Sequence, residues 1–433
     1  MSESVSPLEV IERAVQERAK DISLDMGGQA GTEKLRALIN DELERWSLDH
    51  RRGLRPFDLA EPAIVAERVY RNLAGYGPLG PLLEDDDVWE IMINAPDQIF
   101  AKRHSGPNSY HDEVFHDDEH VLRTLTKILF DASASHRKLD PAEGLQDAQL
   151  DNGSRLHIVH GDVSNGGHTM VNIRKFTGVA FRRLDQLVER GMLTRQAAVF
   201  LAACVRAGMT IVVAGAPGSG KTTLLSCCAA ELDPSLRVVV AEEVFEADVP
   251  LPNVASMQTR APRPDRPGVD LRKLVAGFLR MAPDVAIVGE VRDKEALPLL
   301  LTLSSGVKGF TTIHAGSARQ ALSRLRFICQ LSDTATQLPL SALNTLVSES
   351  IDLVVHCGRT ADGPRVTEII AVEDLAAGPE SAQFTVTQVF ARPGAEQPLA
   401  WSGNLPIRAG RILAAAGADA RRLLDVALED RVG

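Results

Sequence analysis

Apolar residues recur at helical spacing in the first 50 positions of the chain. They repeat every three or four residues over 8–15 and again over 35–43, which predicts two amphipathic helices. Gly27, Gly28 and Gly31 predict a break between the two helices. The basic, turn-rich sequence RRGLRPFD follows at 51–58, so residues 1–54 are predicted to form a helical segment and a linker.

The pattern is mixed between positions 55 and 188. A helix is predicted over 62–73 and a second one over 121–130, where the apolar positions keep a helical period. WEIMIN and QIFAKR predict two strands separated by Pro96 and Asp97, and Asp151-Asn152-Gly153 predicts a turn. GYGPLGPLL, at 75–83, is interpreted as a turn-rich element with apolar anchors, and EDDD after it as a solvated loop. This combination predicts an α+β domain.

Apolar strand-like runs alternate with helical segments from about position 190 onward. TIVVAGA, TLLSCCAAEL, LRVVVAEE, LRKLVAGFLRM and DVAIVGE follow one another in that order. Such alternation predicts an α/β domain with a parallel sheet over residues 189–433. After Asp374 the pattern becomes irregular, with a hairpin-like segment at 384–394 and a helical stretch from Arg408 to Glu429 that is broken at Gly417.

Composition narrows the class of protein. A 44% hydrophobic and 24% charged composition is typical of a soluble globular protein, and 433 residues are more than one core usually holds. The net charge of -11 disfavours general binding of nucleic acid or anionic membrane, so no direct nucleic acid partner is expected. The most apolar stretch, 197–205, is too short to cross a bilayer, and the first residues lack the pattern of a signal peptide.

The five cysteines include no CxxC pair, so the spacing gives no sign of a zinc site. Their odd number favours a reducing, cytosolic setting. Cys227 and Cys228 are adjacent in a predicted helix, which favours buried thiols.

The strongest chemical signal is GAPGSGKT, Gly215–Thr222, which fits the phosphate-binding pattern GxxxxGK[ST]. A predicted strand precedes it and a predicted helix follows, so backbone N–H groups and the helix N-terminus can converge on phosphate. Lys221 is expected to reach the β- and γ-phosphates of ATP, and Thr222 to bind Mg²⁺. A glycine-rich turn with an incidental lysine is the alternative. The residues predicted to hold the nucleotide are Gly215, Ala216, Pro217, Gly218, Ser219, Gly220, Lys221, Thr222 and Thr223.

Acidic residues follow two later predicted strands. LRVVVAEE ends in Glu242 and Glu243, and DVAIVGE ends in Glu290. Carboxyl ends of neighbouring parallel strands face the ligand crevice, where such groups can orient water or hold Mg²⁺. Surface or helix-capping roles are the alternatives. His314 ends another predicted strand, before a helix with Ser317 at its cap, and can contact the γ-phosphate or serve a structural role.

The order of GAPGSGKTT, VVVAEE, QTR, RMAPDVAIVGEVRDKEA and GFTTIHAGSARQALSRL resembles the type II/type IV secretion ATPase superfamily. The sequence is most similar to the CpaF-type ATPases of tight-adherence (Flp) pilus systems. GYGPLGPLLEDDDVWEIMIN resembles the start of that family's N-terminal domain and LPIRAGRILAAAGAD its C-terminal tail, so the resemblance covers about residues 55–420.

This resemblance implies an N-terminal α+β domain and a C-terminal RecA-like ATPase domain. It implies a homohexameric ring in the cytoplasm, bound to the inner face of the cell membrane through a platform protein, that uses ATP and Mg²⁺ to drive a pilus or secretion. Glu242 matches the family's Asp-box glutamate, Glu290 its Walker B acid, and His314 the histidine of its His box. We assign Glu242 to water activation and Glu290 to the Mg²⁺ shell. Arginines of the N-terminal domain or a neighbouring subunit are expected to complete the site, and the candidates are Arg155, Arg174, Arg260 and Arg280.

Four departures from the family pattern are expected to affect the rate of ATP hydrolysis and the communication between subunits. Ala282 stands where the family usually has arginine, Glu243 where it has aspartate, and Gly316 where it has asparagine. Residues 261–269 also differ. Two other functions stay open: a DNA-translocating, conjugation-type ATPase, and a nucleotide-dependent scaffold with negligible hydrolysis.

Overall fold

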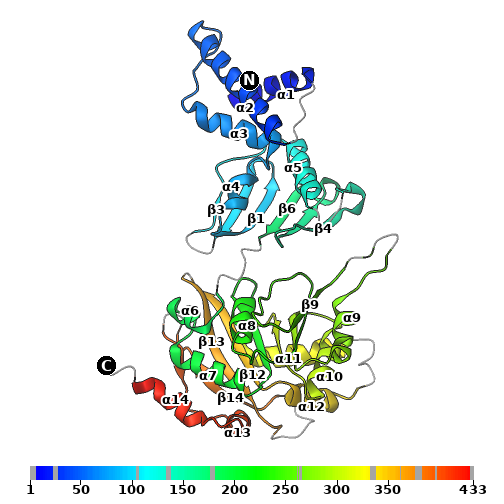
Figure 1. The fold of residues 1–433 in the computed structure, drawn as a ribbon, viewed down its shortest axis with the longest axis vertical. Helices are drawn as coiled ribbons and strands as arrows, with labels where there is room; N and C mark the ends of the chain where they lie inside the picture. The colour runs from blue at the N-terminus through cyan, green and yellow to red at the C-terminus, as the bar shows by residue number, and fades with distance from the viewer. Residues whose placement is uncertain are drawn as a thin grey trace. The chain divides into compact units, whose positions relative to one another are not determined.

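The computed structural model describes residues 6–22, 28–103, 107–132, 138–175, 181–260, 262, 266–331, 338–360, 362–375, 383–394 and 397–429. Contacts divide the chain into unit 1, Met1–Thr177, and unit 2, Gly178–Gly433 (Figure 1). The predicted boundaries at 54/55 and 188/189 remain predictions. Each unit has its own sheet and its own hydrophobic cores.

Three helices begin unit 1 and share one core. They are α1 (Pro7–Asp21), α2 (Gly28–Arg51) and α3 (Pro62–Ala74). Buried Val15, Leu35 and Val69 come from the three helices in turn. The predicted break is shorter than expected, because Gly28 and Gly31 lie inside α2, while Gly27 lies outside the described residues. Burial of the α2 face offsets the roughly 1 kcal/mol that a glycine costs a helix.

The sheet of unit 1 has six strands in the order β3-β2-β1-β6-β5-β4, and every pair is antiparallel. Helix α5 (Asp118–Asp131) is capped by Asp117, whose side chain accepts from His120 N, and it buries Val121 and Leu125 against the sheet. The predicted turn-rich element contains a short helix, α4 (Leu79–Glu84). The strands are β1 (Val88–Ala95), β2 (Gln98–Arg103), β3 (Ser109–Tyr110), β4 (Leu145–Gln149), β5 (Arg155–Val159) and β6 (Met170–Arg174), with 3-10 turns η1 (Pro141–Glu143) and η2 (Gly161–Val163).

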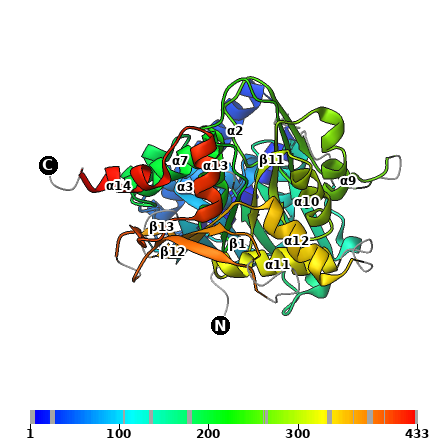
Figure 2. The same cartoon turned by 90° about the horizontal axis from the view of Figure 1, so that it is seen from below.

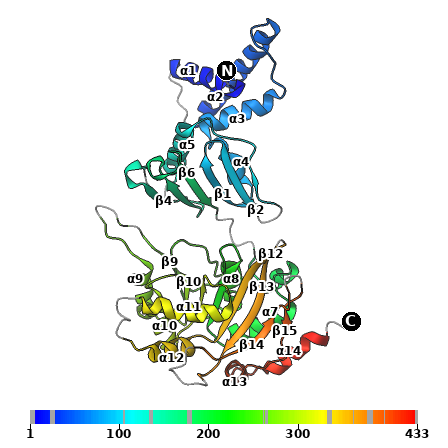
Figure 3. The same cartoon turned by 180° about the vertical axis from the view of Figure 1, so that it is seen from behind.

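The sheet of unit 2 has nine strands in the order β15-β14-β13-β12-β7-β11-β10-β8-β9 (Figure 3). The six from β12 to β9 run parallel, and β13, β14 and β15 extend the sheet antiparallel. The predicted parallel sheet is therefore confirmed. The strands are β7 (Ile211–Gly215), β8 (Val238–Glu242), β9 (Val254–Gln258), β10 (Val285–Val291), β11 (Lys308–Ile313), β12 (Leu353–Thr360), β13 (Gly363–Val372), β14 (Val386–Ala391) and β15 (Ala400–Trp401).

Helices cover both faces of this sheet because successive residues of each parallel strand point to opposite cores. Ile211 and Val213 of β7 face one core, and Val212 and Ala214 face the other. The first core is covered by α6 (Leu184–Glu189), α7 (Arg195–Arg206), α8 (Lys221–Ala229), α13 (Ile407–Ala415) and α14 (Ala420–Glu429). The second is covered by α9 (Leu271–Ala276), the 3-10 turn η3 (Phe278–Met281), α10 (Ala296–Ser304), α11 (Ala318–Gln330) and α12 (Leu340–Ser350).

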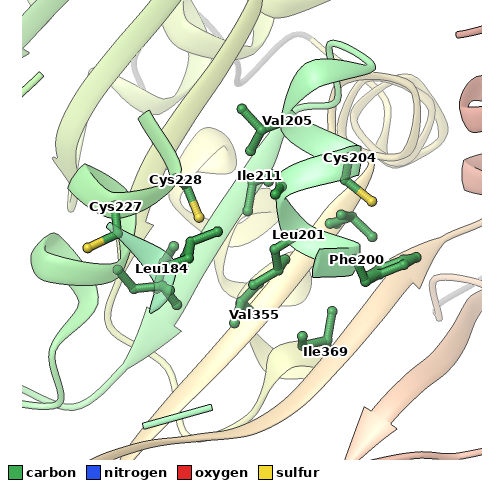
Figure 4. Packing of buried hydrophobic residues seen from close by; sticks show 14 of the residues in the cluster. Leu184, Phe200, Leu201, Cys204, Val205, Ile211, Cys227, Cys228, Val355 and Ile369 are labelled. Carbon is green, nitrogen blue, oxygen red and sulfur yellow. The ribbon is translucent and has the colours of Figure 1, made fainter. Parts of the chain in front are cut away.

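The C-terminal helices belong to the first core. Leu413 of α13 and Leu424 of α14 are fully buried, and both helices lie beside α7 (Figure 2). Figure 4 shows α7 side chains such as Leu201 packed against Val355 of β12. All five cysteines are buried and unbridged, as predicted for Cys227 and Cys228. No described helix combines the length and low polarity that a bilayer crossing requires.

Candidate functional site

The loop Gly215–Gly220 is a tight curl between β7, which is buried throughout, and α8. Gly215 has φ 151°, and an added Cβ would overlap the carbonyl oxygen of Cys357. Gly220, at the N-cap of α8, has φ 83°, which favours glycine over any residue with a side chain. The loop therefore ends at a helix N-terminus with a backbone that only glycine tolerates, which is the geometry that binds phosphate.

Lys221, Glu290 and His314 meet beside this loop. The Lys221 ammonium donates to the carbonyl oxygen of Ala216 at 3.0 Å, and its Nζ lies 3.4 Å from Nδ1 of His314. His314 Nε2 lies 2.5 Å from Glu290 Oε1. The structure thus brings together three residues that the sequence placed 24 to 93 positions apart, from α8, β10 and the end of β11.

The two ring nitrogens of His314 face different partners. Nε2 faces the carboxylate of Glu290, while Nδ1 can either accept from Lys221 or, when it carries the proton, donate to Gly215 O at 3.2 Å. Burial, opposed by Glu290 and reinforced by Lys221, lowers the pKa of His314 below its usual value. The neutral ring is therefore favoured near neutral pH, and it can exchange partners with a small change in its surroundings.

Glu242 ends β8 and is 2% exposed. Its Oε1 accepts from the backbone N–H groups of Glu246 at 3.1 Å and Ala247 at 3.0 Å. Gly289 of β10 lies against it, because an added Cβ there would come within 2.8 Å of Glu242 Cγ. Backbone donors and a bare glycine therefore fix the carboxylate of Glu242 in one orientation, as a group that positions a reactant must be.

Arg292 links the ends of two strands. Its guanidinium donates to Glu290 at 2.5 Å and to Glu243 at 2.9 Å. Burial would raise the pKa of Glu290, but Arg292, His314 and Lys221 outweigh it and hold the pKa below its usual value. Glu290 is therefore ionised at neutral pH and surrounded by donors that a bound cation could replace.

Two side-chain oxygens of the kind that Mg²⁺ prefers lie close together at the start of α8. Thr222 Oγ1 is 3.4 Å from Glu246 Oε2, so a hydroxyl and a carboxylate stand together next to the phosphate loop. Mg²⁺ prefers such hard oxygen donors and usually keeps waters and substrate phosphates as its other ligands. The donor set at Thr222 and Glu246 fits this ion, with Glu290 as a further carboxylate at the same edge of the sheet.

The four predicted arginines fall in two places. Arg155 of β5 and Arg174 of β6 are direct cross-strand neighbours in unit 1, and Glu90 of β1 is the next residue across from Arg174. In unit 2, the guanidinium of Arg260 donates to Pro267 O at 3.1 Å, and that of Arg280 donates to Ala276 O at 3.4 Å. Both unit 2 arginines are exposed, so their groups are accessible for other partners.

Sequence reasoning missed four residues of this site. Arg292 lies two positions after Glu290 in the segment RMAPDVAIVGEVRDKEA, but the sequence pattern alone did not indicate a role for it. Glu246, Gly289 and Arg359 gave no signal, because their contacts cross between elements. Arg359, from β12, donates to Gly218 O at 3.1 Å and so stabilises the phosphate loop from a position 141 residues later in the chain.

Comparison with known proteins gives a family and several relatives for this chain. Residues 72–383 match the family described as Type II/IV secretion system protein. The chain is 31% identical over 330 residues to a putative conjugal transfer protein of Mycobacterium tuberculosis, covering 74% of this chain and 91% of that protein. It is 32% identical over 310 residues to the type IV secretion system protein PtlH of Bordetella pertussis, covering 65% and 89%.

Among solved structures, the VirB11 ATPase of the Brucella suis type IV secretion system is 26% identical, with a TM-score of 0.36, and the match covers 67% of this chain and 94% of that one. The family match over residues 72–383 includes the phosphate loop, the two strand ends that carry Glu242, Glu243 and Glu290, and His314. Because that region spans well over half of the sequence, the chain belongs to the type II/IV secretion system protein family.

Proposed function

We propose that this chain hydrolyses ATP and is the motor subunit of a pilus or secretion machine. The observation that carries the proposal is the meeting of Lys221, His314 and Glu290 at a curled glycine loop, with Glu242 fixed on the next strand. A structural salt-bridge network alone would not require the glycine curl at the start of α8.

Each residue has a distinct proposed role. Lys221 leaves the Ala216 carbonyl and neutralises the β- and γ-phosphate oxygens, while the backbone N–H groups of residues 215–223 hold the phosphates. Glu242 orients and activates the attacking water, and His314 contacts the γ-phosphate. Thr222, Glu246 and Glu290 would hold Mg²⁺, which when bound neutralises charge on the phosphate oxygens.

Arginines would complete the site on closure. A guanidinium stabilises the charge that spreads over the transferring phosphoryl oxygens. The adjacent pair Arg155 and Arg174 would act from the N-terminal domain, and exposed Arg260 and Arg280 from the same or a neighbouring subunit. Hydrolysis that depends on such closure responds to domain motion, which is how a ring converts chemistry into force.

The machine we favour is a tight-adherence (Flp) pilus assembly system. The support is the resemblance of segments outside the phosphate loop, from GYGPLGPLL near residue 75 to LPIRAGRIL near residue 405. A homohexameric ring would bind an inner-membrane platform protein and so lie peripherally on the cytoplasmic face of the membrane. Mass measurement with Mg²⁺ and an ATP analogue tests the ring, and copurification with the platform protein tests the docking.

A second candidate is DNA translocation in conjugation, supported by the Mycobacterium tuberculosis relative that is named a putative conjugal transfer protein. The net charge of -11 weighs against it. Stimulation of ATP hydrolysis by DNA, lost as salt rises, would favour this candidate over the pilus motor. Stimulation by the platform protein alone would favour the pilus motor.

The decisive experiment is a steady-state ATPase assay of the purified full chain with Mg²⁺, alone and with the platform protein. We expect Lys221→Ala to abolish binding or turnover, and Glu242→Gln to keep nucleotide binding but lower turnover at least a hundredfold. Glu231→Gln, in a surface ion pair with Arg206, is the matched control and should leave turnover unchanged. Full turnover in Glu242→Gln would show that another residue activates the water. ATP binding without hydrolysis under all conditions would favour a nucleotide-dependent scaffold over a motor.

A further inference from the structure

Residues 314–317 connect β11 to α11, which begins at Ala318, and His314 is the first residue of this connection. Inside the connection, Gly316 N donates to Gln320 Oε1 at 2.6 Å, and Ser317 caps α11 by accepting from Gln320 N at 3.1 Å. Two further contacts come from the antiparallel pair β12 and β13, which lies later in the chain.

His356 of β12 holds the start of the connection. Its Nε2 lies 3.2 Å from Ala315 O, and its Nδ1 lies 2.6 Å from Thr367 Oγ1. A carbonyl oxygen can only accept, so Nε2 carries a proton and donates to Ala315 O. Thr367 Oγ1 also lies 3.1 Å from His356 O, and its single hydroxyl proton can be donated to only one of these two acceptors. In the neutral ring with its proton on Nε2, Nδ1 is the acceptor at the shorter distance, and a proton from Thr367 favours the tautomer that holds Ala315.

Thr367 reaches this position through a β-bulge. His356 pairs with Glu368 and Cys357 pairs with Val366, which leaves Thr367 as the extra residue on β13. Its methyl group would lie 3.0 Å from a Cβ at Gly358, so the bulge closes over a glycine. Bulges often serve to re-aim a side chain next to a functional site, and this one points a hydroxyl at His356.

Glu368 holds the end of the connection. Its Oε1 accepts from Ala318 N, in the first turn of α11, at 2.9 Å. A carboxylate is favoured there because the first N–H groups of a helix lack partners within it. His356 and Glu368 therefore fix Ala315 and Ala318, three residues apart, on the segment that carries His314.

We propose that His356, Thr367 and Glu368 are positioning residues that hold His314 between Lys221 and Glu290. The inference rests on the proposed ATPase function, because it assigns these residues to the same site. They act through the backbone of residues 314–318, so their loss should lower kcat and leave the affinity of the phosphate loop for nucleotide unchanged. A displacement of about 1 Å at a reacting group can cost roughly a hundredfold in rate.

The test compares variants that each remove one buried or part-buried hydroxyl group. Thr367→Val should lower kcat ten- to a hundredfold with KM within about twofold, and Thr367→Ser should restore it. Thr302→Val removes a buried hydroxyl bonded to Pro298 O at 2.9 Å in α10 and is the matched control, with kcat unchanged. If Thr367→Val and Thr302→Val lower kcat equally, the loss is due to general destabilisation of the fold, and the proposal is overturned.

A double-mutant cycle separates positioning from an independent role. If Thr367 acts through His314, Thr367→Val should cost no further kcat in the His314→Ala background. Additive losses would overturn the proposal while leaving the ATPase function intact, since Lys221→Ala tests that function separately.

Hydrogen exchange supplies a readout that does not depend on hydrolysis. In the full chain, amides of the 314–318 segment should exchange at least tenfold faster in Glu368→Leu, and at the wild-type rate in Glu368→Gln, whose Oε1 can still accept from Ala318 N. Unchanged exchange in Glu368→Leu would show that the connection is held without β13 and would overturn the proposal even if the chain proved to be no ATPase.

Discussion

Gly289 leaves no room between β10 and the carboxylate of Glu242. An added Cβ at position 289 would lie 2.8 Å from Glu242 Cγ, closer than Cβ atoms approach other atoms in proteins, and 3.0 Å from Oε1, which is a tight contact. β8 and β10 are neighbouring parallel strands, and Val288 pairs with Ala241. The next residue on each strand is Gly289 and Glu242, so the register places these two side by side. The glycine is therefore what allows Glu242 to lie buried across the end of β10.

Gly289→Ala should displace the Glu242 carboxylate and lower ATP turnover at least tenfold, because a small error at a reacting group has a large effect on rate. Nucleotide binding at the phosphate loop should persist, as measured with a fluorescent ATP analogue. Gly410→Ala in α13 is the control, because a Cβ added there would lie 4.0 Å from Ala420 Cβ, an ordinary van der Waals contact. Wild-type turnover in Gly289→Ala would show that Glu242 needs no fixed orientation.

The local elements of this site could be predicted from the sequence, but its cross-chain contacts could not. Apolar runs and turn residues give β7, the glycine loop and α8, because each depends on neighbours in sequence. The contacts of Gly289 with Glu242 depend on strand order and register, which periodicity does not contain. The bulge at Thr367 is hidden for the same reason, since it exists only relative to the pairing of β12 with β13.

The turn before β10 contains a strained residue. Ala282 has φ 48° and ψ 55°, the only positive φ at a non-glycine position among the described residues. A left-handed conformation costs a residue with a Cβ roughly 1–2 kcal/mol, and glycine costs about 0.5–1 kcal/mol more on folding elsewhere. Ala282→Gly should therefore raise the free energy of unfolding of unit 2 by about 0.5–1 kcal/mol.

Thermal unfolding checks this prediction, and a gain of that size should raise the Tm by roughly 1–4 °C. Ala414→Gly, at an exposed position in α13, should instead lower stability by about 1 kcal/mol. If both glycine variants lose stability equally, the backbone at Ala282 is not strained in solution.

Unit 1 contains a stacked pair of histidines with opposite pH behaviour. Burial, with the charges of His116 and Arg123, lowers the pKa of fully buried His120 to about 4. The hydrogen bond to Glu12 raises the pKa of His116 above its usual value. Between pH 6.5 and 4 the unfolded chain binds a proton at position 120 that the folded unit excludes, so the contribution of His120 to stability is lost as pH falls through this range.

The contribution of His116 is present below pH 6.5 and is lost as pH rises through its folded pKa. His120→Gln should remove most of the loss of stability between pH 6.5 and 4, whereas His157→Gln, at a half-exposed position on β5, should not. Urea unfolding of a Trp401→Phe background checks this, because the remaining Trp46 and Trp89 both lie in unit 1. If the free energy of unfolding of His120→Gln depends on pH as in the wild type, the titration of another group causes the loss of stability.

A buried ion pair ties the C-terminal helix α13 to the base of the phosphate-loop strand. Asp352 accepts from Arg408 at 2.9 Å and from Thr210 N at 2.8 Å, directly before β7. Its side chain is 4% exposed and that of Arg408 15%. Removing one partner of such a pair leaves the other charge buried without compensation, which costs several kcal/mol even where the intact pair adds little net stability.

Asp352→Ala should therefore lower the free energy of unfolding of unit 2 by roughly 3–5 kcal/mol, measured by urea unfolding with circular dichroism. Asp374→Ala breaks the matched pair with Arg411, which is also in α13 but 65–75% exposed, and should cost under about 1 kcal/mol. The two variants differ in the burial of the ion pair and not in the charge removed. A similar loss of unfolding free energy in both would mean that the link from α13 to Thr210 contributes no more to stability than an exposed ion pair does. A large loss confined to Asp352→Ala would instead make this pair the anchor that joins the C-terminal helices to the strand of the nucleotide site.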